Sequence, residues 1–244
     1  MKELTAHLHD LAQKCAFEYR YTYSGFLSLG EQSDAASEHF SSPVAFYGGC
    51  DGAERKIAIF GDEKDLGYKS EPPITAINIA PKNAKFADKL THRDFLGAVL
   101  STGLRREAIG DIITDGSEAY VFCLKSAAEY IINEISSVKH TAVAVSLCRD
   151  IKKLAAKEPK EQLIICPSMR ADAVLCSAYG ISRSKCSELF NLRRVFVNDK
   201  SVLTPAHFLK EGDFITLRGK GRLLLQKVEG TTQKGRLKLT ILVY

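Results

Sequence analysis

Ile74-Thr75-Ala76-Ile77-Asn78-Ile79-Ala80 opens the most regular stretch of this 244-residue sequence. Its alternating apolar residues predict a strand. Five further elements are expected behind it: a helix at 91–104, strands at 109–114 and 119–124, a helix at 126–137 and a strand at 141–147. The order β-α-β-β-α-β is typical of a ferredoxin-like plait, in which two helices cover one face of a four-stranded antiparallel sheet. Thr91, with Asp94 three residues on, predicts a capping box at the first helix.

On either side of this stretch the pattern changes. Before it, we expect a helix at 4–19, a polar loop from Gly30 to Glu38, strands at 44–47 and 56–60, and a turn at 48–52. After it, a charged linker at 149–161 precedes two helices, 169–179 and 183–191, and several short strands. The predicted fold class is therefore α+β. The expected parts are an N-terminal α/β segment (1–70), the plait (71–160) and a small C-terminal domain extended by β-strands (165–244).

Bulk composition excludes several classes of protein. With 45% hydrophobic and 26% charged residues the chain should fold. No apolar run approaches the roughly 20 residues that span a bilayer, and no signal-peptide stretch is visible, so we expect a cytoplasmic protein without a membrane partner. The seven cysteines include no Cys-x-x-Cys pair. They are therefore expected to be reduced and mostly buried thiols, and neither a metal nor a cofactor is predicted.

The charge is divided unevenly along the chain. Residues 165–244 contain 14 Lys and Arg against 6 Asp and Glu, whereas the first 164 residues contain 20 against 23. The whole positive excess therefore lies at the C-terminal end. Such an excess is typical of a protein that binds a polyanion, although a solvated lysine-rich face is a frequent alternative.

The helix predicted at 183–191 has two different sides. Ser182 is its expected N-cap. At 100° per residue, one side presents Arg183, Ser184, Ser187, Glu188 and Asn191, and the opposite side packs Cys186, Leu189, Phe190 and Leu192. The presented side and the positive helix end would donate to backbone phosphates. A merely capped and solvated helix start is the alternative interpretation.

A basic hairpin follows this helix. Arg193 and Arg194 precede the strand 195–197, and the pair Asn198-Asp199 predicts a tight turn before Lys200. We expect the arginine pair and Lys200 to cluster near the helix. Downstream, three cations alternate with glycines that allow close approach to a ligand: Arg218, Lys220 and Arg222.

At this point the C-terminal segment closely resembles the RNA-binding domain named after small-subunit ribosomal protein S-four. The resemblance rests on Met169-Arg170-Ala171-Asp172, on Gly180-Ile181-Ser182-Arg183-Ser184-Lys185, on Val195-Phe196-Val197-Asn198-Asp199 and on Glu211-Gly212-Asp213-Phe214-Ile215. It departs where Ala171 replaces a leucine and where Arg194 and Asp199 replace glycines. The expected RNA-binding residues are Arg170, Ser182, Arg183, Ser184, Lys185, Ser187, Arg193, Arg194, Asn198, Lys200, Arg218, Lys220 and Arg222.

The resemblance to the bacterial YlmH-type proteins covers nearly the whole chain. It rests on Phe46-Tyr47-Gly48-Gly49, Gly52-Ala53-Glu54-Arg55, residues 90–97 (Leu-Thr-His-Arg-Asp-Phe-Leu-Gly) and residues 105–112 (Arg-Arg-Glu-Ala-Ile-Gly-Asp-Ile). It implies work on large ribosomal subunits that carry stranded peptidyl-tRNA, in ribosome-associated quality control, with structured rRNA and tRNA as partners and no small-molecule substrate. His92, Arg93, Arg105 and Arg106 are then candidate contacts with RNA or a protein partner.

Two alternatives remain open. Similar RNA-binding modules occur in pseudouridine synthases, so an RNA-modifying enzyme is the rival hypothesis. We favour a protein without catalytic residues, because the only string that resembles a synthase motif, Arg170-Ala171-Asp172, lies inside the binding module. Tyr120 and Phe122, which alternate on one predicted strand, could stack on bases or belong to the core, and a core role is the commoner one.

Overall fold

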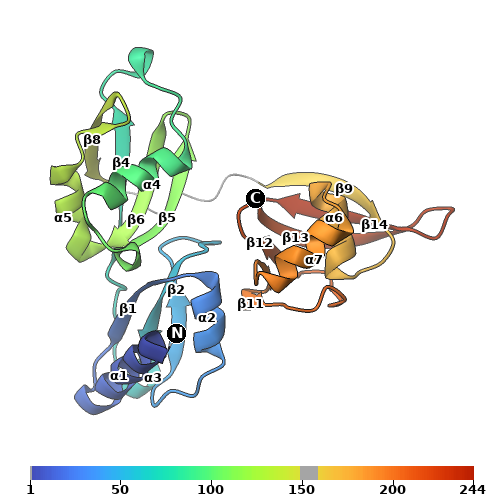
Figure 1. The fold of residues 1–244 in the computed structure, drawn as a ribbon. Helices are drawn as coiled ribbons and strands as arrows, with labels where there is room; N and C mark the ends of the chain where they lie inside the picture. Colours follow the sequence, from blue (N-terminus) through green and yellow to red (C-terminus); the bar gives the residue numbers. More distant parts are fainter. Residues whose placement is uncertain (1, 149–158) are drawn as a thin grey trace. The chain divides into compact units, whose positions relative to one another are not determined.

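The computed structural model describes residues 2–148 and 159–244, which fall into two compact units. We call Met1–Ala156 the N-terminal unit and Lys157–Tyr244 the C-terminal unit. Both units combine helices and sheets (Figure 1), so the α+β prediction is confirmed. Most of the charged linker predicted at 149–161 lies outside the described residues.

The N-terminal unit begins with a small layered segment. Its three strands, β1 (Thr22–Leu27), β2 (Val44–Tyr47) and β3 (Lys56–Phe60), form an antiparallel sheet in the order β1-β3-β2. Helix α1 (Lys2–Glu18) packs on this sheet, and α3 (Glu63–Leu66) follows β3. Leu8, Ala12 and Cys15 of α1 meet Leu27, Ala58 and Phe60 of the sheet in one buried cluster.

The polar loop expected at 30–38 is wrong, because this segment forms helix α2 (Leu29–Ala36). Its start is fixed by a capping box: the main-chain N–H of Ser28 donates to Glu31 Oε2 at 2.6 Å, and Glu31 N–H donates to Ser28 Oγ at 3.5 Å. Buried Ala35 docks the helix on the sheet. The Ser-x-x-Glu signal was present in the sequence and outweighs the polar composition.

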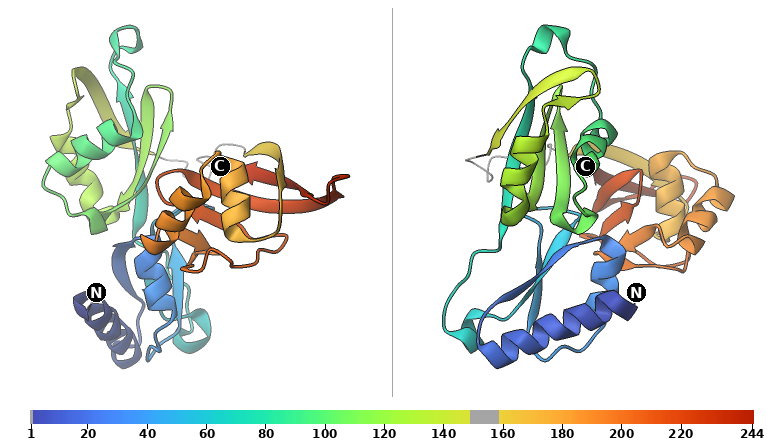
Figure 2. Two further views of the ribbon diagram at one scale, coloured as in Figure 1. Left: turned by 45° about the vertical axis from the view of Figure 1, so that its right-hand side comes forward. Right: turned by 60° about the vertical axis from the view of Figure 1, so that its left-hand side comes forward.

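The second part of the N-terminal unit contains the six predicted elements in their predicted order, with one additional short strand, β7 (Ser137–Val138), so that its sheet has five strands where four were expected. It contains β4 (Ile74–Pro81), the 3-10 turn η1 (Ala84–Phe86), α4 (His92–Ser101), the 3-10 turn η2 (Arg106–Ala108), β5 (Ile109–Asp115), β6 (Glu118–Leu124), α5 (Lys125–Glu134), β7 (Ser137–Val138) and β8 (Thr141–Leu147). The antiparallel sheet runs β5-β6-β4-β8-β7, with β6, β4 and β8 inside and β5 and β7 at the edges. Phe95 and Val99 of α4 and Ile131 of α5 share one core with the sheet, and Figure 2 shows both helices on the same face.

The opposite face of this five-stranded sheet is also covered. Phe122 is fully buried there against Phe26 and Ile57 of the first segment. A Cβ on Gly49, which has φ of 99°, would lie 2.5 Å from the Phe122 ring, so glycine is required by both conformation and contact. Phe122 is therefore core and not a stacking platform. Segments 1–70 and 71–148 share this cluster within one unit; their independence as domains stays a prediction.

The C-terminal unit is a six-stranded antiparallel sheet with two helices on one face (Figure 1). Its elements are β9 (Lys160–Cys166), α6 (Ala171–Tyr179), α7 (Arg183–Asn191), β10 (Val195–Val197), β11 (Lys200–Ser201), β12 (Phe214–Leu217), β13 (Gly221–Thr231) and β14 (Leu237–Val243), with sheet order β11-β10-β12-β13-β14-β9. Val174, Leu175, Cys186 and Phe190 of the helices pack on the sheet. Because β9 pairs with β14 along its whole length, this unit includes residues before the expected start at 165.

Two turns of the C-terminal unit carry residues predicted to bind RNA. One turn ends α7, and the other joins β10 to β11. After α7, Arg193 N–H donates to Phe190 O and Arg194 N–H to Leu189 O, both at 2.9 Å, which is a Schellman motif. Arg193 takes the left-handed conformation, with φ of 52°. Asn198 and Asp199 both have positive φ, 49° and 63°, as a type I′ turn requires, so the predicted tight hairpin is confirmed.

Candidate nucleic-acid interface

The start of α7 presents two cations to solvent. Ser182 Oγ accepts the N–H of Lys185 at 3.3 Å and lies 3.1 Å from Ser184 Oγ, so the predicted cap is confirmed and Ser182 is committed to the helix. Arg183, Ser184 and Lys185 are exposed, and neither cation forms an ion pair within residues 2–148 and 159–244. Two free cations therefore stand at the positive end of a helix, where an anion would be stabilised.

The two sides of α7 are largely as expected. Cys186 and Phe190 are fully buried, Leu189 is partly buried, and Ser187 is half-buried at the boundary. The prediction that Leu192 packs with these buried residues is wrong, because 53% of this residue is exposed. As the C-cap residue it has left the helical register, so the angle of 100° per residue no longer applies to it.

Four exposed cations meet at one end of the C-terminal sheet, and we call Arg193, Arg194, Arg218 and Lys220 the basic cluster. The main-chain N–H of Arg218 donates to Arg194 O at 2.9 Å, next to the pairing of Val195 with Leu217. Lys220 lies in the turn that closes on Leu217 O at 2.8 Å. All four are exposed, and none has an ion-pair partner among the residues that the structure places. The chain therefore assembles a patch of uncompensated positive charge from α7, β12 and their turns.

Lys200 does not join the basic cluster. It pairs with Val197 at the far end of β10, whereas Arg194 precedes the first residue of that strand. Three strand residues separate the two positions, which is roughly 10 Å. The expectation that the arginine pair and Lys200 cluster together is therefore corrected: Lys200 is exposed at the opposite end of the hairpin.

Besides Ser182, three residues on the predicted RNA-binding list are engaged by the protein itself. Asn198 donates from Nδ2 to Asp213 Oδ1 at 2.8 Å and accepts the N–H of Phe214 at 3.0 Å, which clamps the turn. The guanidinium of Arg222 lies 4.2 Å from the centre of the Phe214 ring and 3.6 Å from Asp199 Oδ1, with only 12% of its side chain exposed.

Arg170 is the third. It forms a two-pronged pair with Asp172, with distances of 3.0 and 2.8 Å, and this pair raises the pKa of the guanidinium. The acidic partners of Asn198 and Arg222, by contrast, lie 15 and 23 positions away in sequence, so composition and spacing could not have disclosed them.

The second group of candidates lies in the N-terminal unit around α4. The predicted capping box at Thr91 is present: Asp94 Oδ2 accepts the Thr91 N–H at 2.8 Å and the Thr91 hydroxyl at 2.6 Å. These hydrogen bonds and Lys139, 2.9 Å away, lower the pKa of Asp94 to about 2. Arg93 and Arg105 are exposed. Both remain candidate contacts on geometric grounds.

Arg106, by contrast, is partly buried and has an internal role. It donates from Nη1 to the carbonyl oxygens of Ile109 at 2.6 Å and Gly110 at 3.2 Å. Burial, and then the charge of Arg55, lower its pKa to about 10. The pKa of nearby His92 is lowered by burial and by Arg106. Arg106 therefore orders the chain between η2 and β5.

Sequence reasoning missed the centre of this network, Asp111 on β5. Its two carboxylate oxygens accept main-chain N–H groups of Glu54 at 2.6 Å and Arg55 at 3.2 Å, and burial raises its pKa against these hydrogen bonds and the two nearby guanidinium groups. Arg55 donates onward to the carbonyl oxygens of Phe26 and Ile109. Asp111 and Arg55 both belong to strings that carry the YlmH-type resemblance, and that resemblance was the available signal.

The described residues also bear on metal sites, membrane-spanning helices and cysteine pairs. No cluster of three or more His, Cys, Asp or Glu that could hold a metal ion is present in residues 2–148 and 159–244. In the same ranges, every helix is too short or too polar to cross a membrane. All seven cysteines are free thiols, and four of them, Cys15, Cys123, Cys166 and Cys186, are buried.

Comparison with known proteins identifies a family and matches an RNA-binding domain in the N-terminal unit. Residues 73–150 match a family model described as the putative RNA-binding domain in YlmH. Over 230 residues the chain is 31% identical to the ribosome-associated protein quality control protein P2 of Bacillus subtilis (strain 168), covering 91% of this chain and 87% of that protein.

A solved structure also matches in fold. The cell division protein YlmH from Streptococcus pneumoniae superposes with a TM-score of 0.52 at 11% identity, over 64% of this chain and 94% of that one. The likeness in sequence to the Bacillus subtilis protein extends over nearly both chains, well beyond the matched domain. The chain therefore belongs to the YlmH family of proteins with a putative RNA-binding domain.

Proposed function

We propose that this protein binds structured ribosomal RNA and tRNA in the cytoplasm, on large ribosomal subunits that carry stranded peptidyl-tRNA, as part of ribosome-associated quality control. The observation that carries the proposal is the basic cluster: Arg193, Arg194, Arg218 and Lys220 are exposed together and lack acidic partners among the described residues. Uncompensated cations on a rigid sheet end suit a phosphate backbone, because each contact releases condensed counterions. The name of the Bacillus subtilis relative supports the ribosomal setting.

The C-terminal unit supplies the main contact in this proposal. Helix α7 and the basic cluster belong to the segment that resembles the S-four RNA-binding domain, and two antiparallel hairpins extend it. Arg183 and Lys185 bind phosphates at the start of α7, and Arg193 follows the other end of this helix, which is about 13 Å long. Arg93 and Arg105 of the N-terminal unit make a second contact with RNA or a ribosomal partner. These residues position the RNA without reading individual bases.

Crosslinking of the tagged protein in living cells, followed by sequencing of the recovered RNA, tests this function. Recovery of large-subunit ribosomal RNA together with tRNA is the expected result. Recovery of one RNA position that loses a base modification when the gene is deleted would contradict the proposal and favour an RNA-modifying enzyme. Arg193→Ala with Arg194→Ala serves as the internal control, because this variant should crosslink poorly while its abundance is unchanged.

A further inference from the structure

A second, separate group of exposed cations lies at the distal end of the β13–β14 hairpin. Lys234, Arg236 and Lys238 fall within five residues, and no Asp or Glu occurs from Gly230 to Tyr244. All three are exposed, and the ion pairs of the described chain include none of them. Two carboxylates that reach β13 are engaged elsewhere: Glu229 on β13 contacts Lys227 and Thr240, and Glu211, in the segment before β12, accepts the Val228 N–H.

The hairpin end is an ordered platform. Thr232 N–H donates to Arg236 O at 2.7 Å, Gly235 N–H donates to Thr232 O at 2.9 Å, and Arg236 N–H donates to Thr232 Oγ1 at 3.1 Å. Opposite Lys238 on β13 stands Gly230, and a Cβ built on Gly230 or Gly235 would meet nothing within 4 Å. Cations are thus held on a fixed turn beside open main chain, which a bulky polyanion can approach closely.

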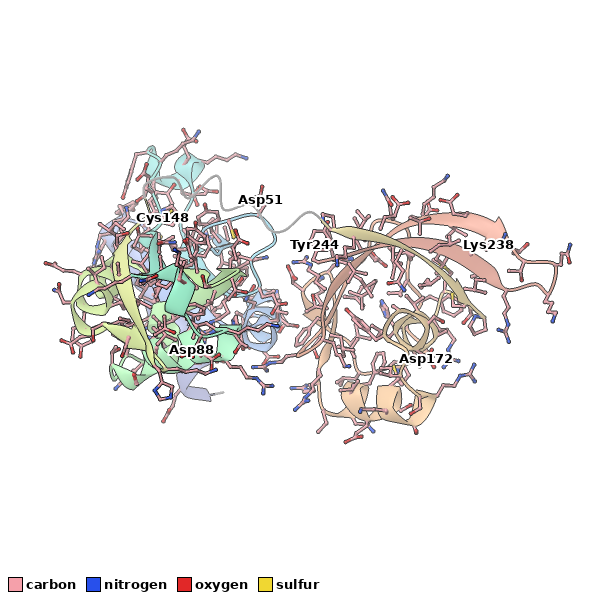
Figure 3. All side chains as sticks on the ribbon, turned by 90° about the horizontal axis from the view of Figure 1, so that it is seen from above. Asp51, Asp88, Cys148, Asp172, Lys238 and Tyr244 are labelled. Atoms are coloured by element: carbon pink, nitrogen blue, oxygen red, sulfur yellow. The ribbon has the colours of Figure 1, made fainter. Side chains whose placement is uncertain are left out.

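This surface lies far from the basic cluster along one strand. β13 starts at Gly221, next to Lys220, and runs eleven residues to Thr231 at the hairpin end. Eleven strand residues span roughly 35 Å. Figure 3 shows the same separation on β14, with Lys238 toward the hairpin end and Tyr244 at the other. Two patches of free positive charge therefore occupy opposite ends of one continuous sheet.

We propose that the β13–β14 hairpin end is a further RNA-backbone contact of the C-terminal unit, in which Lys234, Arg236 and Lys238 bind phosphates of the same RNA that occupies the basic cluster. The inference rests on the proposed function and adds a minimum size for the bound RNA. The RNA must be long and structured to reach both ends of the sheet. Ion pairing to phosphates by three cations adds affinity that depends steeply on salt. Base identity plays no part, because the hairpin end offers cations and open main chain.

The edge strand β9 offers a competing partner. On the outward face, Ile165 pairs with Lys238 and Leu163 with Thr240, and these two aliphatic side chains are 50% and 60% exposed. Such residues could also contact a ribosomal protein. The three cations outnumber these two aliphatic side chains and have no acidic partner among the described residues, so phosphate is the favoured partner. The experiment separates the two by using RNA with and without its proteins.

Equilibrium binding of the full chain is measured as a function of KCl concentration, to purified large ribosomal subunits and to deproteinised large-subunit RNA. The test variant is Lys234→Ala with Arg236→Ala and Lys238→Ala. The control, Lys14→Ala with Lys64→Ala and Lys69→Ala, removes three exposed cations from the first segment. The test variant should bind both targets more than tenfold more weakly, and the slope of log K against log salt should fall by about 0.7 for each phosphate that is no longer neutralised. The control should match wild type.

A conservative variant, Lys234→Arg with Lys238→Arg, keeps all three positive charges because Arg236 is unchanged. It should bind with wild-type affinity. Thermal melts of all variants should superpose, because the three side chains are exposed. A test variant that binds like the control overturns the inference alone. A weakening seen only with intact subunits overturns it in favour of a protein partner. Wild type that binds neither target overturns the proposed function as well.

Discussion

Arg194 and Arg218 are joined by a main-chain hydrogen bond of 2.9 Å from the amide of Arg218 to the carbonyl oxygen of Arg194. Two like charges are thereby held together at the end of a sheet with no carboxylate between them in the described structure. Like charges at neighbouring positions destabilise a fold modestly, and the proposed phosphate contact would relieve this repulsion. This relationship is the structural basis of the proposed RNA contact.

Removing the cations at the start of α7 should affect binding and leave the fold intact. Arg183→Ala and Lys185→Ala each delete an exposed side chain, so unfolding temperatures should barely move while affinity for large-subunit RNA falls. Leu189→Ala, on the packed side of the same helix, is the matched control and should lower the melting temperature. A cation variant that melts early would mean that its side chain is structural.

Arg222 should behave in the opposite way from Arg218. Its guanidinium lies on Phe214 and near Asp199, so Arg222→Ala should lower the free energy of unfolding by about 1–2 kcal/mol. Arg218→Ala should leave that free energy unchanged and weaken RNA binding. Urea denaturation of both variants, with RNA binding measured at the same salt concentration, distinguishes them. Equal stability of the two variants would contradict the assignment of Arg222.

Asp111 should be essential to the N-terminal unit. Asp111→Ala leaves two main-chain N–H groups and two guanidinium groups without their carboxylate, which should cost about 3–5 kcal/mol. Arg93→Ala, which removes an exposed side chain of α4 in the same unit, serves as the control and should be neutral. Denaturation followed by hydrogen exchange locates the destabilised region. Destabilisation confined to the C-terminal unit would be inconsistent with this network.

Lowering the pH should remove the contribution of Asp94 to the free energy of unfolding. Its folded-state pKa is lowered to about 2 by Thr91 and Lys139, below the ordinary value near 4. A lowered carboxyl pKa stabilises the fold above pH 4, and this stabilisation disappears as pH falls toward 2. The difference in unfolding free energy between wild type and Asp94→Asn should therefore shrink between pH 5 and pH 2. A difference independent of pH would show that Asp94 contributes through shape alone.

The C-terminal unit should fold by itself only when β9 is included. Ile164 and Cys166 of β9 lie in its core, and the strand pairs with β14 from Lys160 to Cys166. A fragment of residues 159–244 should unfold cooperatively, and one of residues 167–244 should not. Circular dichroism melts compare the two. Equal cooperativity of both fragments would mean that β9 is dispensable.

Sequence patterns predicted local structure well and side-chain partnership poorly. The period-two alternation at 74–80 and 119–124 and the helix 183–191 were predictable, because each depends on neighbouring residues. The Asn198-Asp199 turn was predictable for the same reason. The internal role of Arg222 was not, since Phe214 and Asp199 reach it only after the strands pair. The role of Arg106 is local, because its partners are the carbonyl oxygens of Ile109 and Gly110, but a side chain that bonds to nearby main chain leaves no pattern of residue types. No local sequence pattern marks Asp111 as the residue that accepts the main-chain N–H groups of Glu54 and Arg55.

The salt dependence of RNA binding tests the central claim most directly. Affinity of the full chain for deproteinised large-subunit RNA is measured over a range of KCl concentrations for wild type, for Arg193→Ala with Arg194→Ala and Arg218→Ala, and for the Lys14, Lys64 and Lys69 alanine control. If the basic cluster binds phosphates, the log–log slope of the cluster variant should be shallower by about 2, because each phosphate left without its cation lowers the slope by about 0.7. The control should keep the wild-type slope. A cluster variant whose slope and affinity equal those of wild type would contradict the account.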